Sequence, residues 1–258
     1  MKVVILCGGK GERLREETEF RPKPLIEIGG MPILWHIMKI FSHYGHKDFI
    51  LLLGYKGYMI KQFFLNFELM LNDFTLDLRN KNPVFFHRKE DLEDWKITFL
   101  DTGLNTNTGG RISRAKEFLK NEKDFFITYG DGVADIRLDQ LIKFHREKKC
   151  IITLTGVKPS SPFGIIEMKD GIAVSFKEKP TLEGIVSGGF FVATPEIFRY
   201  LSDDENCIFE EEPLKRMASE KKLAVYLHEG FWAAMDTYKQ VQVLNRLWES
   251  KNPPWRCW

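Results

Sequence analysis

Short runs of apolar, β-prone residues alternate along this chain with longer segments in which apolar residues recur at helical spacing. The short runs predict buried strands at 3–6, 48–55, 124–135, 151–157, 187–192 and 223–227. The longer segments predict helices at 32–41, 58–67, 112–119, 138–147, 195–201, 209–219 and 237–248. This alternation indicates an α/β fold with a doubly wound, mainly parallel, Rossmann-like sheet and right-handed crossovers, in a single domain over residues 1–258.

Two stretches depart from this alternation. The segment 72–100 holds short, partly alternating apolar runs separated by polar turns, at 74–78, 84–86 and 96–100. These runs predict a small strand-rich excursion or edge. A second pair of runs, 163–168 and 172–176, predicts a β-hairpin across the turn residues 169–171.

The first predicted strand leads into a glycine-rich loop, Cys7-Gly8-Gly9-Lys10-Gly11-Glu12-Arg13. Because glycine lacks a Cβ atom, the backbone N–H groups of such a loop can approach phosphate oxygens closely. The loop is not a P-loop, since Gly11 is followed by Glu12 and not by Lys and Ser or Thr. It is not the dinucleotide fingerprint either, since Leu14 stands where the third glycine is required. An ordinary strand-to-helix turn remains the alternative for a glycine cluster alone.

Two cations near this loop favour a phosphate site over a plain turn. Arg13 and Lys23 bring positive charge to the region, and Lys23 lies between Pro22 and Pro24. Proline restricts its own φ and the residue before it, so we expect these prolines to hold Lys23 extended and aimed. Lys179, which precedes Pro180, is interpreted in the same way.

Two aspartates are candidate metal ligands. Asp131 follows a predicted buried strand and lies between two glycines, and ligands of open α/β sheets bind beyond the carboxyl ends of the strands. A plain turn aspartate is its alternative. Asp236 precedes the last predicted helix, where it would either join the metal site or simply cap the helix. Two carboxylates can hold Mg²⁺ while phosphates and waters complete the coordination.

Two further glycine pairs suggest contact with a ligand. A polar loop at 101–107 leads into a predicted helix through the run Thr108-Gly109-Gly110-Arg111. An anion or a base edge would fit at this helix N-terminus, with simple capping by Thr108 as the alternative. Gly188 and Gly189 open a later strand, where their missing side chains would admit a flat sugar ring.

Composition excludes several classes of partner and mechanism. Lys plus Arg number 38 against 36 Asp plus Glu, so the net charge gives no overall electrostatic attraction to nucleic acid or to an anionic membrane. The four cysteines are too scattered for a zinc motif or a disulfide framework, and we see no leader peptide or membrane-length apolar run, so we expect a soluble cytoplasmic protein. No Ser-His-Asp or Cys-His arrangement in the sequence competes convincingly, as a site of nucleophilic catalysis, with the interpretation as a phosphate and metal site. The neighbouring histidines are interpreted as packing or surface residues: His36, His43 and His46.

The remaining residues fit nucleotidyl transfer. A phosphate monoester has a second pKa of about 6, so its attacking oxygen is already charged at neutral pH and needs no general base. The difficulty is electrostatic, because two polyanions must approach each other. Cations and a metal ion would lower their repulsion, hold the attack in line and stabilise the departing pyrophosphate.

The chain resembles the sugar-1-phosphate nucleotidyltransferases, and most closely the bacterial glucose-1-phosphate cytidylyltransferases. The motifs that carry this resemblance run nearly end to end, at 6–14, 22–24, 32–38, 54–58, 101–103, 108–111, 128–135, 178–180, 188–192 and 235–237. Two of them point to the cytidylyl branch, Tyr129-Gly130-Asp131-Gly132-Val133-Ala134-Asp135 and Gly54-Tyr55-Lys56-Gly57-Tyr58.

The resemblance implies a GT-A-like nucleotidyltransferase fold and a definite reaction. CTP and α-D-glucose 1-phosphate would give CDP-glucose and pyrophosphate with Mg²⁺ as cofactor, for dideoxyhexose and surface polysaccharide (O-antigen) synthesis. It also implies a homo-oligomer, a trimer or hexamer, to which the segment 72–100 would contribute.

The resemblance also assigns roles to individual residues. The nucleotide and its phosphates would be bound by Leu6, Cys7, Gly8, Gly9, Lys10, Gly11, Glu12 and Arg13, with Lys23 on the phosphates. Thr106, Arg111 and Gly130 would surround the nucleotide, with Arg111 reading the base. Lys179, preceded by Glu178, would meet the sugar phosphate, with Gly189 on the sugar side, and Asp131 and Asp236 would hold Mg²⁺. The expected catalytic residues are Arg13, Lys23, Lys179 and Asp131.

Three departures from the related enzymes concern the sugar. Ser161-Pro162 stands where relatives have Gly-Arg, Ser187 stands in place of an asparagine, and Ala233-Ala234 replaces a bulkier pair. A changed hydroxyl contact alters selectivity, because a buried polar group left unpaired is costly. Two alternatives therefore stay open: the same chemistry on another sugar 1-phosphate or nucleoside triphosphate, and a non-catalytic nucleotide-sugar binding protein.

Overall fold

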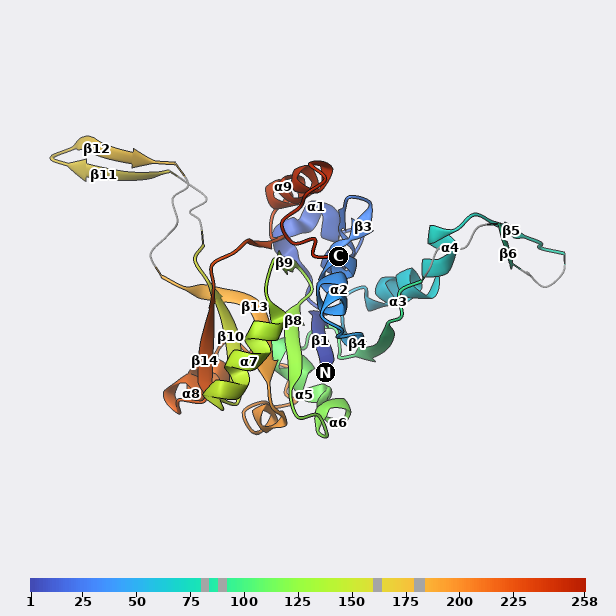
Figure 1. Cartoon of the computed structure of the whole chain (residues 1–258), viewed down its shortest axis with the longest axis horizontal. Helices are drawn as coiled ribbons and strands as arrows, with labels where there is room; N and C mark the ends of the chain where they lie inside the picture. The colour runs from blue at the N-terminus through green and yellow to red at the C-terminus, as the bar shows by residue number, and fades with distance from the viewer. Residues whose placement is uncertain (80–83, 88–91, 160–163, 179–183) are drawn as a thin grey trace.

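The computed structural model describes residues 1–79, 84–87, 92–159, 164–178 and 184–258, and among these the central sheet has seven strands (Figure 1). In spatial order they are β14 (Leu223–His228), β10 (Ile152–Val157), β13 (Val186–Ala193), β8 (Phe125–Tyr129), β1 (Lys2–Cys7), β4 (Asp48–Leu53) and β7 (Lys96–Asp101). Strand β13 runs antiparallel to its neighbours β8 and β10, and the other pairs are parallel. The predicted mainly parallel α/β sheet is confirmed.

Apolar residues on the two faces of the sheet build two cores. Alternate residues of β1 point to opposite faces, so that Val3 and Ile5 enter one core while Val4 and Leu6 enter the other. The first core is covered by α2 (Ile33–His43), α7 (Leu138–Lys148) and α9 (Tyr238–Glu249). The second is covered by α5 (Thr108–Arg114), α6 (Lys116–Leu119) and α8 (Glu212–Ser219). Helices on both faces make the sheet doubly wound.

Several helix ends differ from the predicted ones. Helix α2 begins at Ile33, because Pro32 is extended (φ −54°, ψ 143°) and pairs in the short strand β3 (Met31–Pro32). The helix expected at 112–119 begins at Thr108 and is interrupted at Ala115, which separates α5 from α6. The helix expected at 195–201 is the 3₁₀ helix η3 (Pro195–Arg199). The segment predicted at 58–67 forms α3 (Gly57–Leu65).

Two arms project from opposite sides of the body (Figure 1). One holds α4 (Phe67–Leu71) and the hairpin of β5 (Phe74–Leu76) and β6 (Val84–Phe86). The excursion predicted at 72–100 is therefore shorter than expected, because its last run is β7, a parallel edge strand of the main sheet. The other arm is the predicted hairpin, with β11 (Ile165–Lys169) and β12 (Ile172–Lys177).

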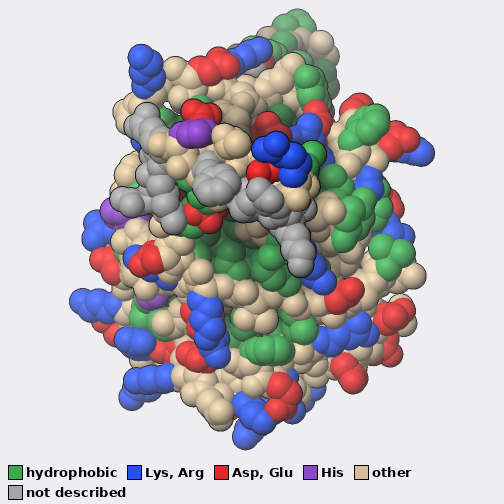
Figure 2. All heavy atoms as spheres, turned by 90° about the vertical axis from the view of Figure 1, so that its right-hand side faces the viewer, with side chains coloured by type: hydrophobic (Ala, Val, Ile, Leu, Met, Phe, Trp, Pro, Cys, Tyr) green, Lys and Arg blue, Asp and Glu red, His purple; other side chains and the backbone are tan. Residues whose placement is uncertain are grey.

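Both arms carry exposed apolar side chains. In the second arm, Met168, Ile172 and Phe176 are each more than 60% exposed. Figure 2 shows apolar side chains gathered on the face from which the first arm projects. There a cavity of about 320 Å³ is lined by Phe20, Met59, Phe63, Phe67 and Met70, among others. Exposed apolar surface of this kind is typical of interaction sites.

Short elements complete the chain around the carboxyl ends of the parallel strands. They are η1 (Glu12–Leu14), α1 (Arg15–Thr18), η2 (Lys23–Leu25), β2 (Glu27–Ile28), β9 (Gly132–Ala134) and β15 (Trp232–Ala234). Strand β2 pairs with β3, and β9 pairs antiparallel with β15. In the described part of the chain we find no helix that is long and apolar enough to cross a membrane.

Candidate functional site

A cavity of about 670 Å³ opens where the parallel strands end. Its walls come from the glycine loop after β1, the loop between β7 and α5, and the turn after β8. It is lined by Leu6, Cys7, Gly8, Gly9, Lys10, Gly11, Glu12, Arg13, Lys23, Pro24, Leu104, Asn105, Thr106, Asn107, Thr108, Arg111, Tyr129, Gly130 and Asp131. The structure thus brings together the residues predicted to surround a nucleotide.

The three glycines of the loop are needed for three different reasons, and only one of these reasons is space for a ligand. A Cβ atom at Gly8 would lie 2.3 Å from Arg111 Cζ, so Gly8 makes room for a protein side chain. Gly11 has a left-handed backbone (φ +66°) and precedes η1. At Gly9 an added Cβ would meet no atom within 4 Å, so here the backbone is open to the cavity.

Lys23 is aimed into the site, but not by an extended backbone as predicted. It is the first residue of the 3₁₀ helix η2, where Leu25 N donates to Pro22 O at 2.8 Å and Ile26 N donates to Lys23 O. These bonds outweigh the preference of a residue before proline for an extended conformation. The lysine Nζ atom reaches Asp131 Oδ2 at 2.6 Å and Asp236 Oδ1 at 2.7 Å.

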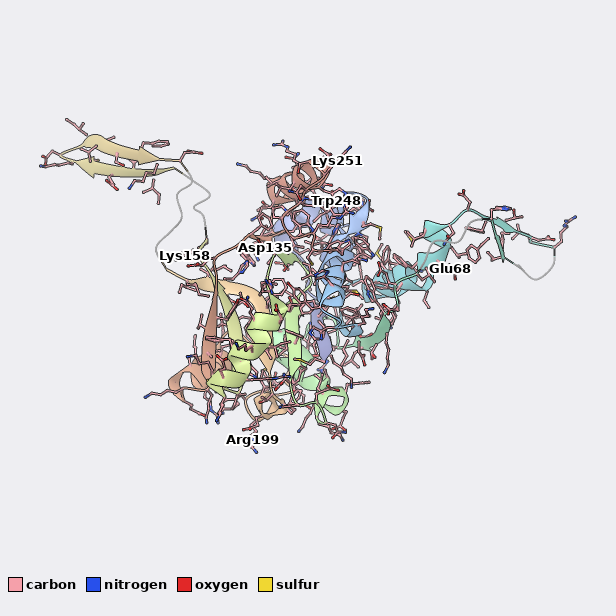
Figure 3. The ribbon with its side chains drawn as sticks, in the orientation of Figure 1. Glu68, Asp135, Lys158, Arg199, Trp248 and Lys251 are labelled. Carbon is pink, nitrogen blue, oxygen red and sulfur yellow. The ribbon has the colours of Figure 1, made fainter. Side chains whose placement is uncertain are left out.

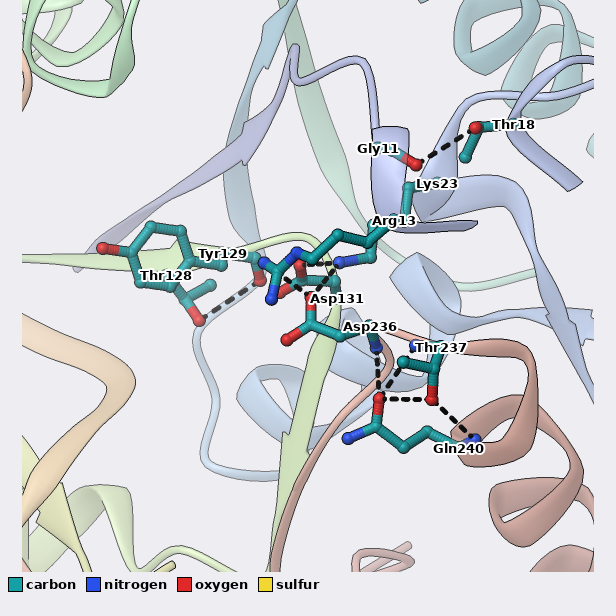
Figure 4. A network of polar contacts seen from close by, with 10 residues as sticks. All are labelled: Gly11, Arg13, Thr18, Lys23, Thr128, Tyr129, Asp131, Asp236, Thr237 and Gln240. Carbon is teal, nitrogen blue, oxygen red and sulfur yellow. Dashed lines mark hydrogen bonds and ion pairs between the residues drawn. The ribbon is translucent and has the colours of Figure 1, made fainter. Parts of the chain in front are cut away.

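The ribbon of β9 and β15 explains why Asp131 and Asp236 meet. Asp131 comes directly before β9, and Asp236 follows β15 by two residues. Antiparallel pairing of these strands, with Met235 N donating to Asp131 O, places the two carboxylates on the same cation (Figure 4). The helix-cap interpretation of Asp236 is wrong, because Thr237 is the N-cap of α9 and forms a capping box with Gln240.

The carboxylates already gather positive charge. Arg13 Nη2 lies 3.0 Å from Asp236 Oδ1, the same oxygen that Lys23 contacts. Among the described residues no cluster of three or more His, Cys, Asp or Glu side chains exists, so these two aspartates would leave most coordination positions to other ligands. The Lys23 ammonium between them is a stand-in cation, and the pair therefore fits a divalent ion that also takes oxygens from phosphates and water.

A second cavity of about 260 Å³ shares Arg13, Tyr129 and Asp131 with the first. Its other lining residues are Thr128, Gly132, Ser187, Gly188, Gly189, Phe190, Trp232, Ala234 and Asp236. The indole Nε1 of Trp232 donates to Gly188 O at 2.7 Å, which fixes one wall. Two ligands bound in these cavities would meet at the carboxylates.

The glycine pair in the second cavity does not leave empty space, contrary to the prediction. Gly189 has φ +79°, and a Cβ there would lie 2.7 Å from the Tyr129 ring. At Gly188 a Cβ would lie 2.9 Å from Val157 Cγ1. The missing side chains of these glycines therefore make room for protein atoms.

The first turn of α5 does not offer free amides for an anion. Gly109 N and Gly110 N both donate to Cys207 O, at 2.9 and 3.1 Å. The Thr108 hydroxyl does not cap the helix: it donates to Glu210 Oε2 and accepts from Phe209 N. The start of α5 therefore packs against the segment 204–210, and neither an anion site on these amides nor a Thr108 cap is formed.

Arg111 and Thr106 line the larger cavity, yet both are held by the protein. Arg111 is only 4% exposed, and its two terminal nitrogens donate to protein oxygens. Thr106 is equally buried, and its hydroxyl accepts from Arg114 at 3.0 Å. In this structure the guanidinium of Arg111 contacts protein oxygens around the cavity. Its predicted base-reading role stays a prediction.

Sequence reasoning missed Glu210 and the role of Tyr129. Tyr129 lies between the two cavities, and its hydroxyl donates to Glu210, which also accepts from Thr108. Burial and then the charge of Glu210 raise the pKa of Tyr129, so the phenol stays protonated as a donor. No motif marked Glu210, because its partners lie about 80 to 100 positions away in sequence.

Two other features bear on the predicted chemistry. Burial, and to a smaller extent the charge of Asp131, raises the pKa of the Cys7 thiol, so Cys7 is kept from acting as a thiolate.

Lys179, Ser161 and Pro162 lie outside the described residues. Glu178 is described and follows β12 directly. Ser187 and Ala234 both line the second cavity, and their predicted effect on the choice of sugar stays a prediction.

Comparisons with known proteins agree with this geometry. The nucleotidyl transferase family model matches residues 2–237. A Bacillus subtilis protein named "Probable glucose-1-phosphate cytidylyltransferase" is 50% identical over 258 residues, 100% of both chains. The glucose-1-phosphate cytidylyltransferase of Salmonella typhimurium is 44% identical over 259 residues, again 100% of both.

Solved structures share the fold at low sequence identity. An apo UDP-glucose pyrophosphorylase superposes with a TM-score of 0.69 at 15% identity, covering 97% of this chain and 98% of the other. The inositol-1-phosphate CTP transferase of T. maritima gives a TM-score of 0.63 at 14% identity, with 95% of each chain covered. The GT-A-like fold is confirmed, and the chain belongs to the nucleotidyl transferase family, with full-length relatives among the bacterial glucose-1-phosphate cytidylyltransferases.

Proposed function

We propose that this chain is a glucose-1-phosphate cytidylyltransferase, which transfers CMP from CTP to α-D-glucose 1-phosphate. The observation that carries the proposal is the meeting of Asp131, Asp236, Lys23 and Arg13 where two cavities join. The larger cavity takes the nucleotide and the smaller takes the hexose phosphate. Relatives with this name at 50% and 44% identity support the choice of both substrates.

The site fits a divalent cation, and we propose Mg²⁺. Asp131 and Asp236 would hold it, since both already face the ammonium of Lys23. When bound, the ion supplies charge neutralisation for the phosphates. The family supports a divalent metal in general, and oxygen ligands with room for phosphates and waters favour Mg²⁺ within that class.

The residues of this chain bring two polyanions together and hold them in line. A phosphate oxygen of glucose 1-phosphate attacks the α-phosphorus of CTP, and the bond from that phosphorus to the β-phosphate oxygen breaks. Pyrophosphate leaves with the bonding electron pair, and no proton is removed from the nucleophile. Arg13 and Lys23 lower the repulsion between the substrates and stabilise the charge of the leaving group.

Other residues bind and orient. The loop from Leu6 to Glu12, including Lys10, would surround the nucleotide, and Gly9 leaves its backbone open to the phosphates. Thr106 and Gly130 line the same cavity. The resemblance to the family supports Lys179, next to Glu178, as the cation on the sugar phosphate, and it supports Gly189 as a residue on the sugar side.

We further propose a cytoplasmic homo-oligomer, a trimer or hexamer, whose product feeds dideoxyhexose synthesis for surface polysaccharide. The resemblance supports this assembly, and so do the two projecting arms with exposed apolar side chains (Figure 1). Such surface is costly to leave in water.

Pyrophosphate release tests the proposal directly. The protein is incubated with Mg²⁺ and each of CTP, dTTP, UTP, ATP and GTP, against a panel of sugar 1-phosphates that includes glucose 1-phosphate. We expect release with CTP and glucose 1-phosphate only. Release with another pair would keep the mechanism and move the specificity to the altered residues Ser187 and Ala234. Nucleotide binding without release in any mixture would indicate a non-catalytic binding protein.

A further inference from the structure

The turn between β4 and α3 holds a motif, Gly54-Tyr55-Lys56-Gly57, that the proposed mechanism does not use. Within the described chain, neither Tyr55 nor Lys56 lines the larger or the smaller cavity. After this turn the chain continues through α3 to α4, where Glu68 lies in the first arm (Figure 3). The turn nevertheless contacts the glycine loop at both of its ends.

Tyr55 makes a contact at each end of the loop. Its backbone N donates to Gly8 O at 3.1 Å, directly after β1. Its hydroxyl donates to Thr18 O at 3.0 Å, at the end of α1. Between these two points lie residues 9–13, which line the larger cavity. Because Tyr55 follows β4, the strand beside β1, the two bonds fix both ends of the loop to the sheet.

Lys56 adds to the contact at the end of α1. Its ammonium donates to Thr18 O at 3.4 Å and to Glu19 O, and it lies 5.2 Å from the centre of the Tyr55 ring. The last carbonyls of a helix lack partners within the helix and carry partial negative charge, so a cation is favourable there. The backbone of Lys56 is left-handed (φ 49°, ψ 29°), a conformation that glycine adopts without strain. The reason for a lysine at this position is therefore its side chain.

Thr18 connects this anchor to the two cations of the site. It is 3% exposed, and its hydroxyl lies 3.1 Å from Gly11 O (Figure 4) and 3.1 Å from Leu14 O. These contacts enclose η1, the short helix that carries Arg13. A Cβ added at Gly11 would lie 2.7 Å from Thr18 Cγ2 and 3.3 Å from Lys23 Cβ, so the three segments are in close contact. A displacement of Thr18 would therefore disturb Arg13 and the backbone beside Lys23.

The glycines of the loop make such an anchor useful. With glycine at positions 8, 9 and 11, the unanchored loop has many conformations, so fixing it is costly in entropy. If the loop is in place in only a fraction of the molecules, the apparent affinity for a ligand falls in proportion to that fraction. Contacts outside the cavity that hold the ends of the loop therefore increase affinity without touching the ligand.

We propose that Tyr55 and Lys56 are positioning residues, which hold the glycine loop in its nucleotide-binding conformation before the nucleotide arrives. They act through Thr18 on Arg13 and on the backbone of the loop, and not by contact with a substrate. This inference deepens the proposed function and rests on it for the identity of the nucleotide. The anchoring of the loop does not depend on that identity.

The experiment uses the full chain with Tyr55→Phe, Lys56→Gly and both changes together. Tyr55→Phe removes only the hydroxyl, and Lys56→Gly removes the ammonium while suiting the left-handed backbone. Tyr58→Phe is the control for the first change, because Tyr58 is the next tyrosine along the chain and is 61% exposed. Lys149→Gly is the control for the second, because Lys149 is exposed and has the same left-handed backbone (φ 53°) at the C-cap of α7.

Three quantities are measured for each protein. Hydrogen exchange of residues 8–19 without nucleotide reports the order of the loop, and exchange in α9 reports the rest of the fold. Calorimetric titration gives the Kd of CTP. Steady-state kinetics with Mg²⁺, CTP and glucose 1-phosphate gives kcat and the KM of each substrate.

We expect faster exchange at 8–19 in the double variant, with unchanged exchange in α9. The Kd and KM of CTP should rise about fivefold, as for a loop that is in place in about a fifth of the molecules. At saturating CTP, kcat and the KM of glucose 1-phosphate should stay within about twofold, because the bound nucleotide then holds the loop in place. The two controls should match the unaltered chain.

Three results would overturn the proposal. Unchanged exchange at 8–19 would show that the turn does not anchor the loop, and faster exchange in α9 as well would show that the two residues stabilise the whole fold. A fall in kcat with an unchanged KM for CTP would indicate a direct catalytic role instead. If the unaltered chain bound no CTP, the proposed function would fail, while the exchange result would still decide whether the turn anchors the loop.

Discussion

Lys23 Nζ lies 2.6 Å from Asp131 Oδ2, across 108 positions of sequence. The same nitrogen lies 2.7 Å from Asp236 Oδ1, so a single ammonium joins the two carboxylates proposed to hold the metal ion. Lys23 is also proposed to contact phosphates. Lys23 therefore pairs with the two carboxylates in the free protein and would pair with phosphates in the reacting complex. A divalent cation and the ammonium compete for the same carboxylate oxygens.

This competition is tested with Lys23→Met. We expect the variant to bind Mn²⁺ about tenfold more tightly than the unaltered chain in the absence of nucleotide, since two unpaired carboxylates attract a divalent cation more strongly. Turnover should fall by about a hundredfold or more, because a cation is lost from the phosphates. Electron paramagnetic resonance of free Mn²⁺ reports the affinity independently of activity. Lys47→Met, at an exposed ion pair with Asp94, is the control, and equal Mn²⁺ affinity in all three proteins would contradict the idea.

Asp131→Asn separates the metal role from nucleotide binding. We expect turnover to fall by about a hundredfold or more, because an amide oxygen is a poorer ligand than a carboxylate, while CTP binding without metal is kept. Calorimetric titration with CTP and a pyrophosphate assay check the two quantities. Asp94→Asn removes a carboxylate at an exposed surface ion pair and serves as control. Normal turnover in Asp131→Asn would remove the aspartate from the mechanism.

Trp232→Phe tests the smaller cavity. The indole N–H that fixes Gly188 O is lost, so we expect the KM for the sugar phosphate to rise about fivefold, with the KM for the nucleotide unchanged. Steady-state kinetics with each substrate varied in turn gives both constants. Trp95→Phe is the matched control, because its indole N–H has no hydrogen-bond partner within the described ranges. A rise in the nucleotide KM instead would show that the cavities are assigned the wrong way round.

His36 predicts how stability depends on pH. The ring is fully buried, its Nε2 lies 2.8 Å from Ile28 O, and Trp255 Nε1 donates to its Nδ1, so the neutral ring is the one that fits. Burial lowers the pKa of His36 from 6.5 to about 4. As the pH falls, the unfolded chain takes up the proton first, so stability is complete above pH 6.5 and is lost from there down to about pH 4.

The expected loss is measurable by urea unfolding. Between pH 7 and pH 5 the His36 contribution to the free energy of unfolding should fall by about 2 kcal/mol. The variant His36→Asn should be less stable at pH 7 but should lose that much less between the two pH values. An equal pH dependence in the variant would show that His36 is not the group responsible. The prediction of a packing role for His36 is confirmed by its burial.

The sequence by itself determined the sheet and the types of group in the site. Apolar runs such as 48–53 form strands, because burying them outweighs other local preferences, and alternation with helices makes parallel pairing the geometry that short connections allow. The sequence motifs also identified the family, since residues such as Asp131 and Lys23 stand in recognisable local patterns. These features depend on neighbours in sequence.

Only the tertiary structure decided which groups meet and what the glycines are for. The pairing of β9 with β15 brings Asp236 to Asp131, and Thr237, not Asp236, caps α9. Gly8 must be a glycine because the buried guanidinium of Arg111, more than 100 positions away in the sequence, occupies the space of a Cβ atom. Local patterns cannot carry such information, because the contacts are made between segments whose approach is fixed by the packing of the whole sheet.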